Sequence, residues 1–242
     1  MLPAVDLTLF LPFLEQRQLI LTPGKRLARD ITRSWVAQQH SNRPVVVTPR
    51  VEALDGWLEG MWSEWAELGR LPSLRLLSHQ QELVVWQQII KEDIAELDGF
   101  SLMHPRAAAS RAKTARDRLL LFQAERVDGL WSHFQFDEDC RVFARWAQQF
   151  EQRLSQLAAT TRYDAYQQML TASGFEKESV GLYAAPKLAP LPQRVLEHLC
   201  QVTLIEPPCR QQDDVVTVAF SSRETELAAA AEWAYENSQQ AN

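Results

Sequence analysis

Cysteine and histidine are scarce in this sequence, which limits the sites that the chain can build. Its 242 residues include three cysteines, Cys140, Cys200 and Cys209, and none of them forms a CxxC pair. An odd number of thiols at irregular spacing argues against a disulfide framework and against a zinc site, so we interpret them as buried or incidental. The five histidines are scattered and none lies in HExxH spacing. We therefore predict no metal site.

Long apolar runs are missing as well. No segment approaches the roughly 20 apolar residues that a membrane-spanning helix requires. The N-terminus lacks the basic start and the small-residue cleavage site of a signal peptide. Hydrophobic residues make up 46% of the chain, which is enough to fill a sizeable core. We expect a soluble, cytoplasmic globular protein without a membrane partner.

The formal net charge of −6 argues against a protein that coats nucleic acid through bulk charge. The charge is unevenly distributed, however. Residues 1–50 carry seven basic and three acidic side chains, and residues 101–150 carry eight basic and six acidic ones. A nucleic-acid surface is therefore expected only in these two blocks.

Two stretches of the chain alternate short apolar strands with amphipathic helices, which predicts an α/β fold with parallel strands, because each helix supplies a crossover. The predicted strands lie near residues 18–23, 45–48, 180–184, 201–205 and 215–220. The helices between and after them are predicted at about 26–39, 54–68, 192–200 and 224–235. Ser221 and Glu224 form a capping box before the last of these helices.

Residues 71–170 have a different character, with almost no glycine and no convincing strand pattern. Ser78 and Gln81 form a capping box that begins a helix. Further helices are predicted near 107–124, 138–157 and 163–170. The acidic run that begins at Asp137 lies at a predicted helix start. Because acidic side chains stabilise a helix N-terminus, we interpret this run as a helix cap rather than as a magnesium site. The simplest organisation is an α/β domain formed by residues 1–70 and 175–242, interrupted by a helical insertion at 71–174.

Tryptophan is frequent and raises the possibility of base stacking. Five of the tryptophans fall on apolar helical stripes with Leu, Met, Ile and Phe, which favours core packing. They are Trp57, Trp62, Trp65, Trp86 and Trp146.

Six segments, taken in order, resemble the inactivated superfamily I helicases, the RecC- and AddB-like proteins of bacterial DNA end processing. They resemble most the group in which the helicase-like part is fused to a C-terminal PD-(D/E)XK nuclease. The segments are LILTPGKRLARDI at 19–31, VVVTPRVEALDGWLEGMW at 45–62, LLSHQQELVVWQQII at 76–90, RWAQQFEQRL at 145–154, GLYAAPKLAPLPQRVLEHL at 181–199 and VAFSSRETELAAAAEWA at 218–234.

This resemblance implies a degenerate RecA-like, P-loop NTPase-like sheet domain, the 1A domain, interrupted by a helical 1B domain. The nuclease of such proteins lies far downstream, so the resemblance assigns no nuclease residue to this chain. It also implies a role in DNA repair and recombination, with a downstream nuclease domain or a partner helicase.

The nucleotide-binding motifs of an active helicase are absent. A P-loop requires GxxxxGK[ST], whose glycines let backbone amides surround the phosphates. Gly24-Lys25 is the sole GK pair, but Leu19 stands where the first glycine belongs and Arg26 stands where a hydroxyl would hold magnesium. The strand at 180–183 ends in two alanines rather than an acidic metal ligand. We predict no cofactor and no catalytic residue in this chain.

Two basic groups are candidates for DNA contacts. The first lies on one face of the helix after the first strand, and the second lies in the helical insertion, where Arg106 and Arg118 accompany it. The candidate residues are Lys25, Arg26, Arg29, Arg33, Arg111, Lys113 and Arg116. The alternative for each group is a merely solvated face.

Three functions remain open. The first is a noncatalytic helicase-like scaffold that holds or routes DNA ends, with weak and sequence-independent DNA binding. The second is a protein-interaction or assembly domain that does not contact DNA. The third is an unrecognised hydrolase, which would need convergent titratable groups in a deep pocket. Ser221 lies in no GxSxG context, so capping is preferred to a nucleophilic role.

Overall fold

The computed structural model describes residues 5–40, 45–95, 104–122, 134, 137–183, 188–206 and 218–240. The chain divides into two compact units, residues 1–207 and 208–242, and each unit is described by itself. No helix of the described residues is long and apolar enough to cross a membrane.

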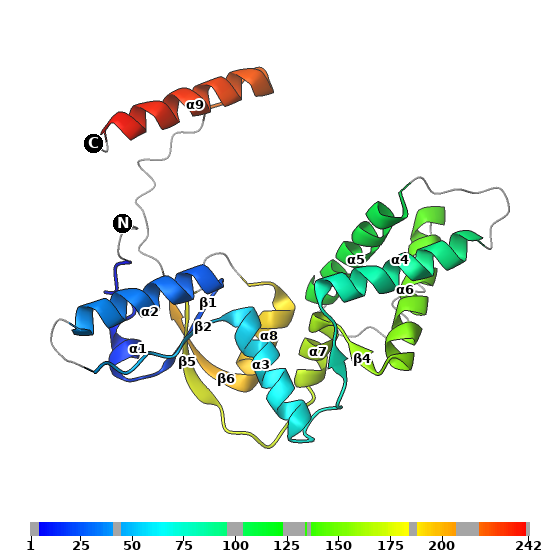
Figure 1. Ribbon diagram of the computed structural model, residues 1–242, viewed down its shortest axis with the longest axis horizontal. Helices are drawn as coiled ribbons and strands as arrows, with labels where there is room; N and C mark the ends of the chain where they lie inside the picture. Colours follow the sequence, from blue (N-terminus) through cyan, green and yellow to red (C-terminus); the bar gives the residue numbers. More distant parts are fainter. Residues whose placement is uncertain are drawn as a thin grey trace. The chain divides into compact units, whose positions relative to one another are not determined.

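The first unit contains a four-stranded sheet in which every strand pair is parallel, in the order β2-β1-β5-β6 (Figure 1). All four residues of β1 are buried, as expected for a strand that is covered on both faces. The predicted α/β class with a parallel sheet is therefore confirmed. The strands are β1 (Leu19–Thr22), β2 (Val51–Ala53), β5 (Glu178–Tyr183) and β6 (Cys200–Ile205).

Helices cover both faces of this sheet because side chains along each strand alternate between the faces. Leu19 and Leu21 of β1 pack into a core with α3, α7 and α8, whereas Ile20 packs into a second core with α1 and α2. The result is a layered α/β arrangement. These helices are α1 (Leu11–Glu15), α2 (Lys25–His40), α3 (Leu54–Glu67), α7 (Arg162–Met169) and α8 (Pro190–Leu199).

The short helix α1 was not predicted, and it fits closely against the sheet at a glycine of β5. A Cβ atom placed on Gly181 would lie 2.7 Å from Cδ1 of Phe13 and 2.9 Å from Cδ1 of Ile205. The missing side chain of Gly181 thus makes room for the Phe13 ring, and a larger residue would force α1 away from the sheet.

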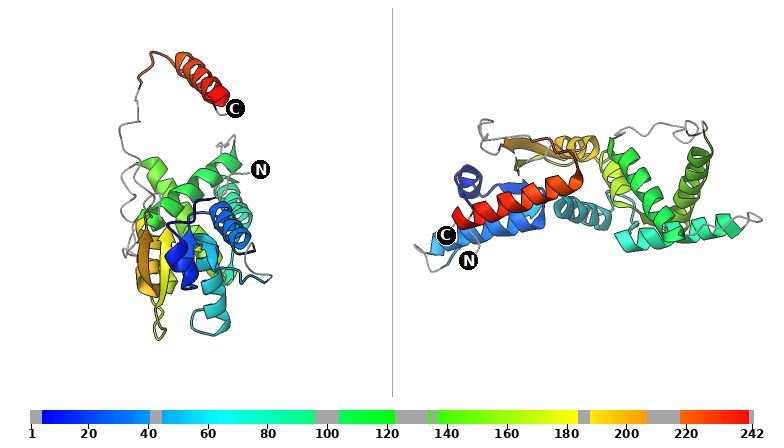
Figure 2. Two further views of the ribbon diagram at one scale, coloured as in Figure 1. Left: turned by 90° about the vertical axis from the view of Figure 1, so that its left-hand side faces the viewer. Right: turned by 90° about the horizontal axis from the view of Figure 1, so that it is seen from above.

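The remaining helices of the first unit, α4 (His79–Ala95), α5 (Pro105–Phe122) and α6 (Glu138–Gln156), pack together beside the sheet (Figures 1 and 2). Their core is centred on Trp86 and Phe150, whose rings stack at 4.4 Å. The tryptophans of the stripes are buried, as predicted, except Trp146, which is half-buried.

The helices α4 and α6 have the predicted N-terminal caps. Ser78 accepts a hydrogen bond from the backbone N–H of Gln81 at 3.3 Å, and the side chain of Gln81 accepts one from Ser78 N–H at 2.9 Å. Asp137 accepts a hydrogen bond from the N–H of Cys140 at 2.7 Å. This cap explains why an acidic residue stands at position 137.

Two expectations about strands were wrong. The block 71–170 was expected to lack strands, but β3 (Arg75–Leu76) pairs in parallel with β4 (Ala159–Thr160). These two-residue strands are too short to leave a periodic pattern. The strand expected at 45–48 is formed instead by β2, which pairs with β1. The strand β1 begins only at Leu19, because the chain turns before it, where Arg17 has a φ of 56°. Within the described ranges, residues 45–48 consequently have no neighbouring strand with which to pair.

The second unit contains α9 (Arg223–Gln240) in its described part. Its cap is formed by Ser222 and Thr225, whose N–H donates to the Ser222 hydroxyl at 3.3 Å, so the predicted pair Ser221 and Glu224 was displaced by one residue. The predicted strand at 215–220 lies mostly outside the described residues, and residues 218–220 are not in a strand.

Candidate functional site

The carboxyl ends of parallel strands are where α/β sheets usually bind ligands. At this edge β1 leads through Pro23 and Gly24 into α2. The buried hydroxyl of Thr22 lies 3.1 Å from the carbonyl oxygen of Gly24 and 3.2 Å from that of Glu52, which fixes the turn against β2. Pro23 has no N–H, so the turn has one phosphate donor fewer than a glycine-rich loop.

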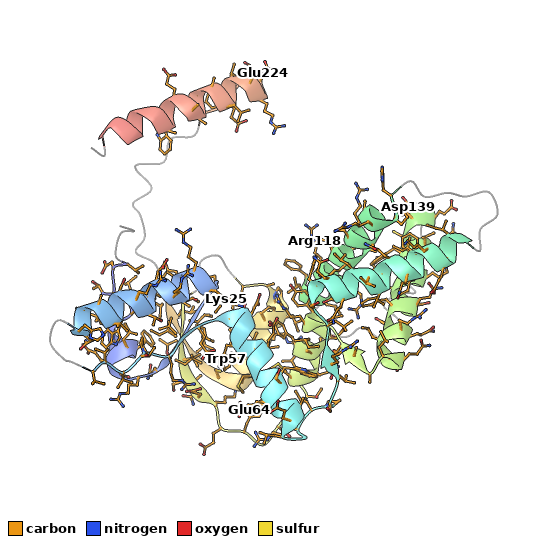
Figure 3. All side chains as sticks on the ribbon, viewed as in Figure 1. Lys25, Trp57, Glu64, Arg118, Asp139 and Glu224 are labelled. Atoms are coloured by element: carbon orange, nitrogen blue, oxygen red, sulfur yellow. The ribbon has the colours of Figure 1, made fainter. Side chains whose placement is uncertain are left out.

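A shallow cavity of about 440 Å³ lies beside this turn, between α2 and α3. Lys25 lies at the start of α2, and its Cε atom is 3.9 Å from the position of a Cβ on Gly56 of α3 (Figure 3). Arg29 and Arg33 follow on the same side of α2, one turn and two turns further. Lys25, Arg29 and Arg33 therefore line one cavity.

The electrostatics of this cavity favour an anion. Lys25, Arg29 and Arg33 are exposed, and none of the three forms an ion pair within the described parts of the chain. The acidic residue that lines the cavity is Glu52. Arg26, the fourth candidate on α2, lies outside the lining, and its Nε is 3.9 Å from a carboxylate oxygen of Asp30. The name α2 row is used below for Lys25, Arg29 and Arg33.

In the second candidate group, which lies on α5, most of the side chains form ion pairs within the protein. The Lys113 Nζ atom lies 2.6 Å from Asp117 Oδ2 and 3.1 Å from Glu82 Oε2. Arg116 is 3% exposed and donates two hydrogen bonds to Asp164, at 2.9 and 3.0 Å.

These contacts remove Lys113 and Arg116 from the predicted DNA-contact set, because both side chains are buried against carboxylates. Both belong to the buried stripe of α5, together with Ala109 and Ala112. Arg111 lies on the exposed side of the same helix.

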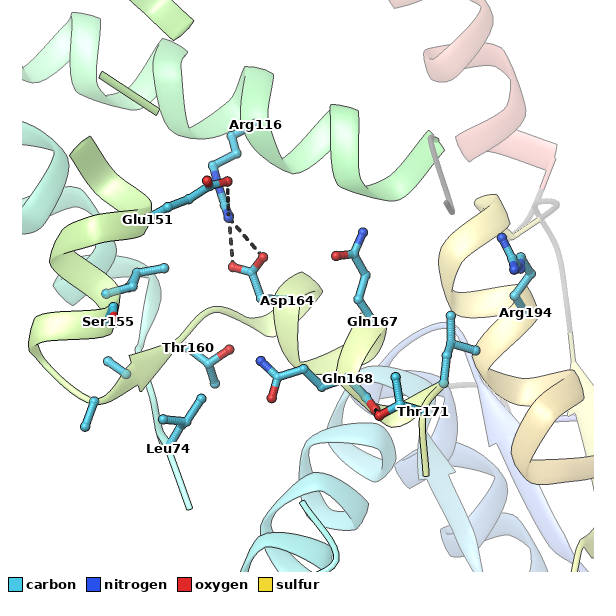
Figure 4. Close-up of a pocket in the computed structure, with 14 residues that line it drawn as sticks. Leu74, Arg116, Glu151, Ser155, Thr160, Asp164, Gln167, Gln168, Thr171 and Arg194 are labelled. Carbon is cyan, nitrogen blue, oxygen red and sulfur yellow. Dashed lines mark hydrogen bonds and ion pairs between the residues drawn. The ribbon is translucent and has the colours of Figure 1, made fainter. Parts of the chain in front are cut away.

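A larger cleft of about 660 Å³ lies around Arg116, and sequence reasoning did not find it (Figure 4). Its walls come from α5, α6, β4, α7 and α8 and from Leu74. Asp164 lines this cleft and also accepts a 2.6 Å hydrogen bond from the hydroxyl of Thr161, the N-cap of α7. The Thr-x-x-Asp spacing was a visible helix-start signal, but it did not reveal the partner Arg116.

Titratable groups also gather around Lys113, at a third cavity of about 530 Å³. Burial raises the pKa of Glu82, although the charge of Lys113 opposes the change. Burial likewise raises the pKa of Tyr163. Glu82 and Asp117 are both engaged with Lys113, so this group is arranged for structural ion pairing. In the described part of the chain, no three or more His, Cys, Asp or Glu side chains are placed to hold a metal ion.

Cys200 is buried at the start of β6, and burial raises the pKa of its thiol to about 11. A thiol in this state is a poor nucleophile near neutral pH. Cys140 is half-buried, and Cys209 lies outside the described residues.

No protein-family model matches this chain, and no curated protein sequence is significantly similar to it.

Proposed function

We propose that this chain is a noncatalytic scaffold that holds DNA through the α2 row, as the helicase-like region of a bacterial DNA repair or recombination nuclease. The observation that carries the proposal is that Lys25, Arg29 and Arg33 line one cavity beside the edge strand β2 of a parallel sheet. The proposed partners are DNA and either a downstream nuclease domain or a partner helicase. The parallel sheet agrees with a degenerate RecA-like domain, which is part of the proposal.

Phosphates are the expected ligands of the α2 row. When exposed cationic side chains bind DNA phosphates, the counterions condensed on the DNA are released. This release favours binding, and it does not depend on the base sequence. Binding should therefore be weak, insensitive to sequence and strongly dependent on salt.

The test is a titration of fluorescent single-stranded and duplex DNA at several salt concentrations. The variant Lys25→Ala, Arg29→Ala, Arg33→Ala should reduce the slope of log K against log salt by about one unit for each phosphate that the variant no longer binds. A matched control is Arg70→Ala, Arg75→Ala, Lys91→Ala, which removes the same charge from exposed side chains that do not line this cavity. The control should retain more affinity than the α2 variant.

A nucleotide is not expected in the turn before α2. Pro23 lacks an N–H and Arg26 has no oxygen for magnesium, so a calorimetric titration with Mg-ATP should show no saturation. Saturable binding tighter than about 0.1 mM, equivalent to roughly 5–6 kcal/mol, would contradict this expectation.

An assembly domain is the second candidate function. It is favoured by two large side chains of α9 that are exposed within their own unit, Leu227 at 60% and Trp233 at 68%. If the α2 variant binds DNA with unchanged affinity and unchanged salt slope while remaining folded, the assembly function is the better proposal.

A further inference from the structure

The segment at 45–50, which leads into β2, has an unpaired backbone and an exposed apolar side. Residues 45–49 form no backbone–backbone hydrogen bond among the residues that the structure describes. Val45 is 79% exposed and Val47 is 62% exposed, whereas Val46 between them is half-buried. This alternation is typical of an extended chain. Unpaired N–H and C=O groups on a β-branched extended segment are a template for a further strand.

A cavity of about 470 Å³ lies beside this segment, which runs past α1 into β2 (Figure 1). Its volume is within the range of roughly 300–1,000 Å³ that is usual for ligand pockets. Leu14 of α1 and the half-buried Trp35 of α2 supply apolar wall. Because side chains of paired strands share faces, a strand added to residues 45–48 would direct every second side chain to the side of Val46, where the protein lies.

The charged side chains of this cavity favour one acidic group on the partner. Arg50 is paired with Glu178, but Arg17 is exposed and forms no ion pair within the described residues. Arg17 follows α1 with a φ of 56°, in a left-handed conformation where glycine is usual at a helix end. An arginine at such a position costs free energy, which indicates a role for its side chain. The nearby carboxylate of Glu15 disfavours a second acidic group.

We propose that residues 45–48 bind an extended peptide of a partner protein as an added β-strand. The backbone of the peptide pairs with the free N–H and C=O groups, and its apolar side chains on one face enter the cavity at Trp35. One acidic side chain of the peptide pairs with Arg17. The pairing ends at Pro49, which has no N–H. In this mode the main chain supplies affinity and the cavity supplies specificity.

This peptide site stands apart from the proposed DNA surface. Its cavity shares no lining residue with the cavity of the α2 row. Loss of peptide binding would therefore leave the proposed DNA binding in place, and the reverse also holds.

A library of random linear peptides displayed on phage, screened against the full chain, is the test. We expect the enriched peptides to carry apolar residues at alternate positions and one aspartate or glutamate. The most enriched peptide is then synthesised and titrated into the ¹⁵N-labelled chain. The backbone amide signals of residues 45–48 should shift in a saturable way, and their hydrogen exchange should slow.

The variants Val46→Pro and Val47→Pro each remove one backbone N–H. Because successive N–H groups of an extended chain point to opposite edges, one variant should weaken binding about five-fold, the effect of one lost hydrogen bond, and the other should weaken it less. Both should fold, since these N–H groups form no backbone hydrogen bond in the described part of the chain. The matched controls Val46→Thr and Val47→Thr keep the N–H and the branched shape, and they should retain binding.

The variant Arg17→Gln tests the acidic contact. It should weaken binding about three- to five-fold, the effect of one exposed ion pair, and it should remove the advantage of the peptide over its glutamine or asparagine analogue. The matched control Lys91→Gln removes an exposed charge outside the cavity and should leave the affinity unchanged.

The proposal is wrong if no peptide is enriched over a screen without the chain. It is also wrong if the enriched peptide binds both proline variants as tightly as the unmodified chain. Saturable shifts of residues 45–48 with single-stranded oligothymidine but not with the peptide would assign this segment to a DNA surface instead. If a proline variant fails to fold, the titration of the unmodified chain decides, because shifts confined to other residues exclude strand addition here.

Discussion

The ion pair between Arg116 and Asp164 joins α5 to α7, and its removal tests the description of this part of the fold. Arg116 is 3% exposed, so its charge depends on protein partners rather than on water. The variant Asp164→Ala removes both of its short hydrogen bonds, at 2.9 and 3.0 Å. Glu151 remains, but its closest approach is 3.6 Å and its side chain is 38% exposed.

Breaking a buried pair costs about 3–5 kcal/mol, because the remaining charge is left without compensation. We expect a value near the lower end, about 3 kcal/mol, because water can reach the partly exposed Asp164 site and Glu151 can move closer. The double variant Arg116→Met, Asp164→Leu removes both charges and should lie within about 1–2 kcal/mol of the unmodified chain. The single variant is therefore expected to be the less stable of the two.

Urea unfolding measures these differences in the free energy of unfolding, provided that tryptophan fluorescence and far-UV circular dichroism give the same transition. The matched control is Glu92→Ala, which breaks the pair between Glu92 and Arg153. That pair is equally short at 2.9 Å, but its side chains are 60% and 37% exposed. Its removal should cost at most about 1 kcal/mol.

The reasoning is refuted if Asp164→Ala costs no more than Glu92→Ala. It is also refuted if the double variant is the least stable of the three, since that would show that the pair itself, rather than an uncompensated buried charge, determines the effect.

Three further changes test the remaining contacts. Gly181→Ala should destabilise the chain by about 1–3 kcal/mol because its methyl would overlap the Phe13 ring, and Phe13→Leu in the same chain should recover part of this stability in urea unfolding. Burial raises the pKa of Asp93, but the hydrogen bonds from Arg145 and Trp146 and the charge of Arg145 together outweigh burial and hold the pKa below the ordinary 3.8. The stability that Asp93 contributes is present above this value and is lost as the pH falls through the lower folded-state pKa, so Asp93→Asn should be less sensitive to acid, and an equal acid dependence would contradict this. Ser78→Ala should cost about 1 kcal/mol by removing the capping box of α4, and an unchanged urea midpoint would show that the cap is dispensable.

The parallel sheet could be predicted from the sequence because its strands are apolar runs followed by amphipathic helices. The predicted strand at 45–48 shows the limit of that pattern. Three successive valines have a high strand propensity, but a strand also needs a neighbour. The turn at Arg17 makes the neighbouring strand β1 begin too late in the chain to pair with residues 45–48. Pairing partners are set by tertiary structure, which local propensity does not contain.

The cleft of Figure 4 was beyond prediction for a related reason. Arg116 and Asp164 are 48 residues apart, and the hollow beside them exists only where α5, α6 and α7 meet. In contrast, the burial of Arg116 could have been anticipated. Positions 109, 112, 113 and 116 follow the spacing of one helix face, and the alanines among them indicate close packing. The basic residues were instead assigned to the surface because of their type.

Burial separates the two basic groups that the sequence presents as equivalent. Lys113 and Arg116 are neutralised by carboxylates inside the first unit, so they add no field that an approaching phosphate would encounter. The α2 row keeps its charge at the surface, and its field extends about one Debye length, roughly 10 Å at 0.1 M salt. The net charge of −6 is spread over the whole chain, so beyond that distance it is largely screened from a phosphate at α2. The proposed DNA binding at this one face is therefore compatible with an acidic chain, and we expect that raising the salt concentration would abolish it.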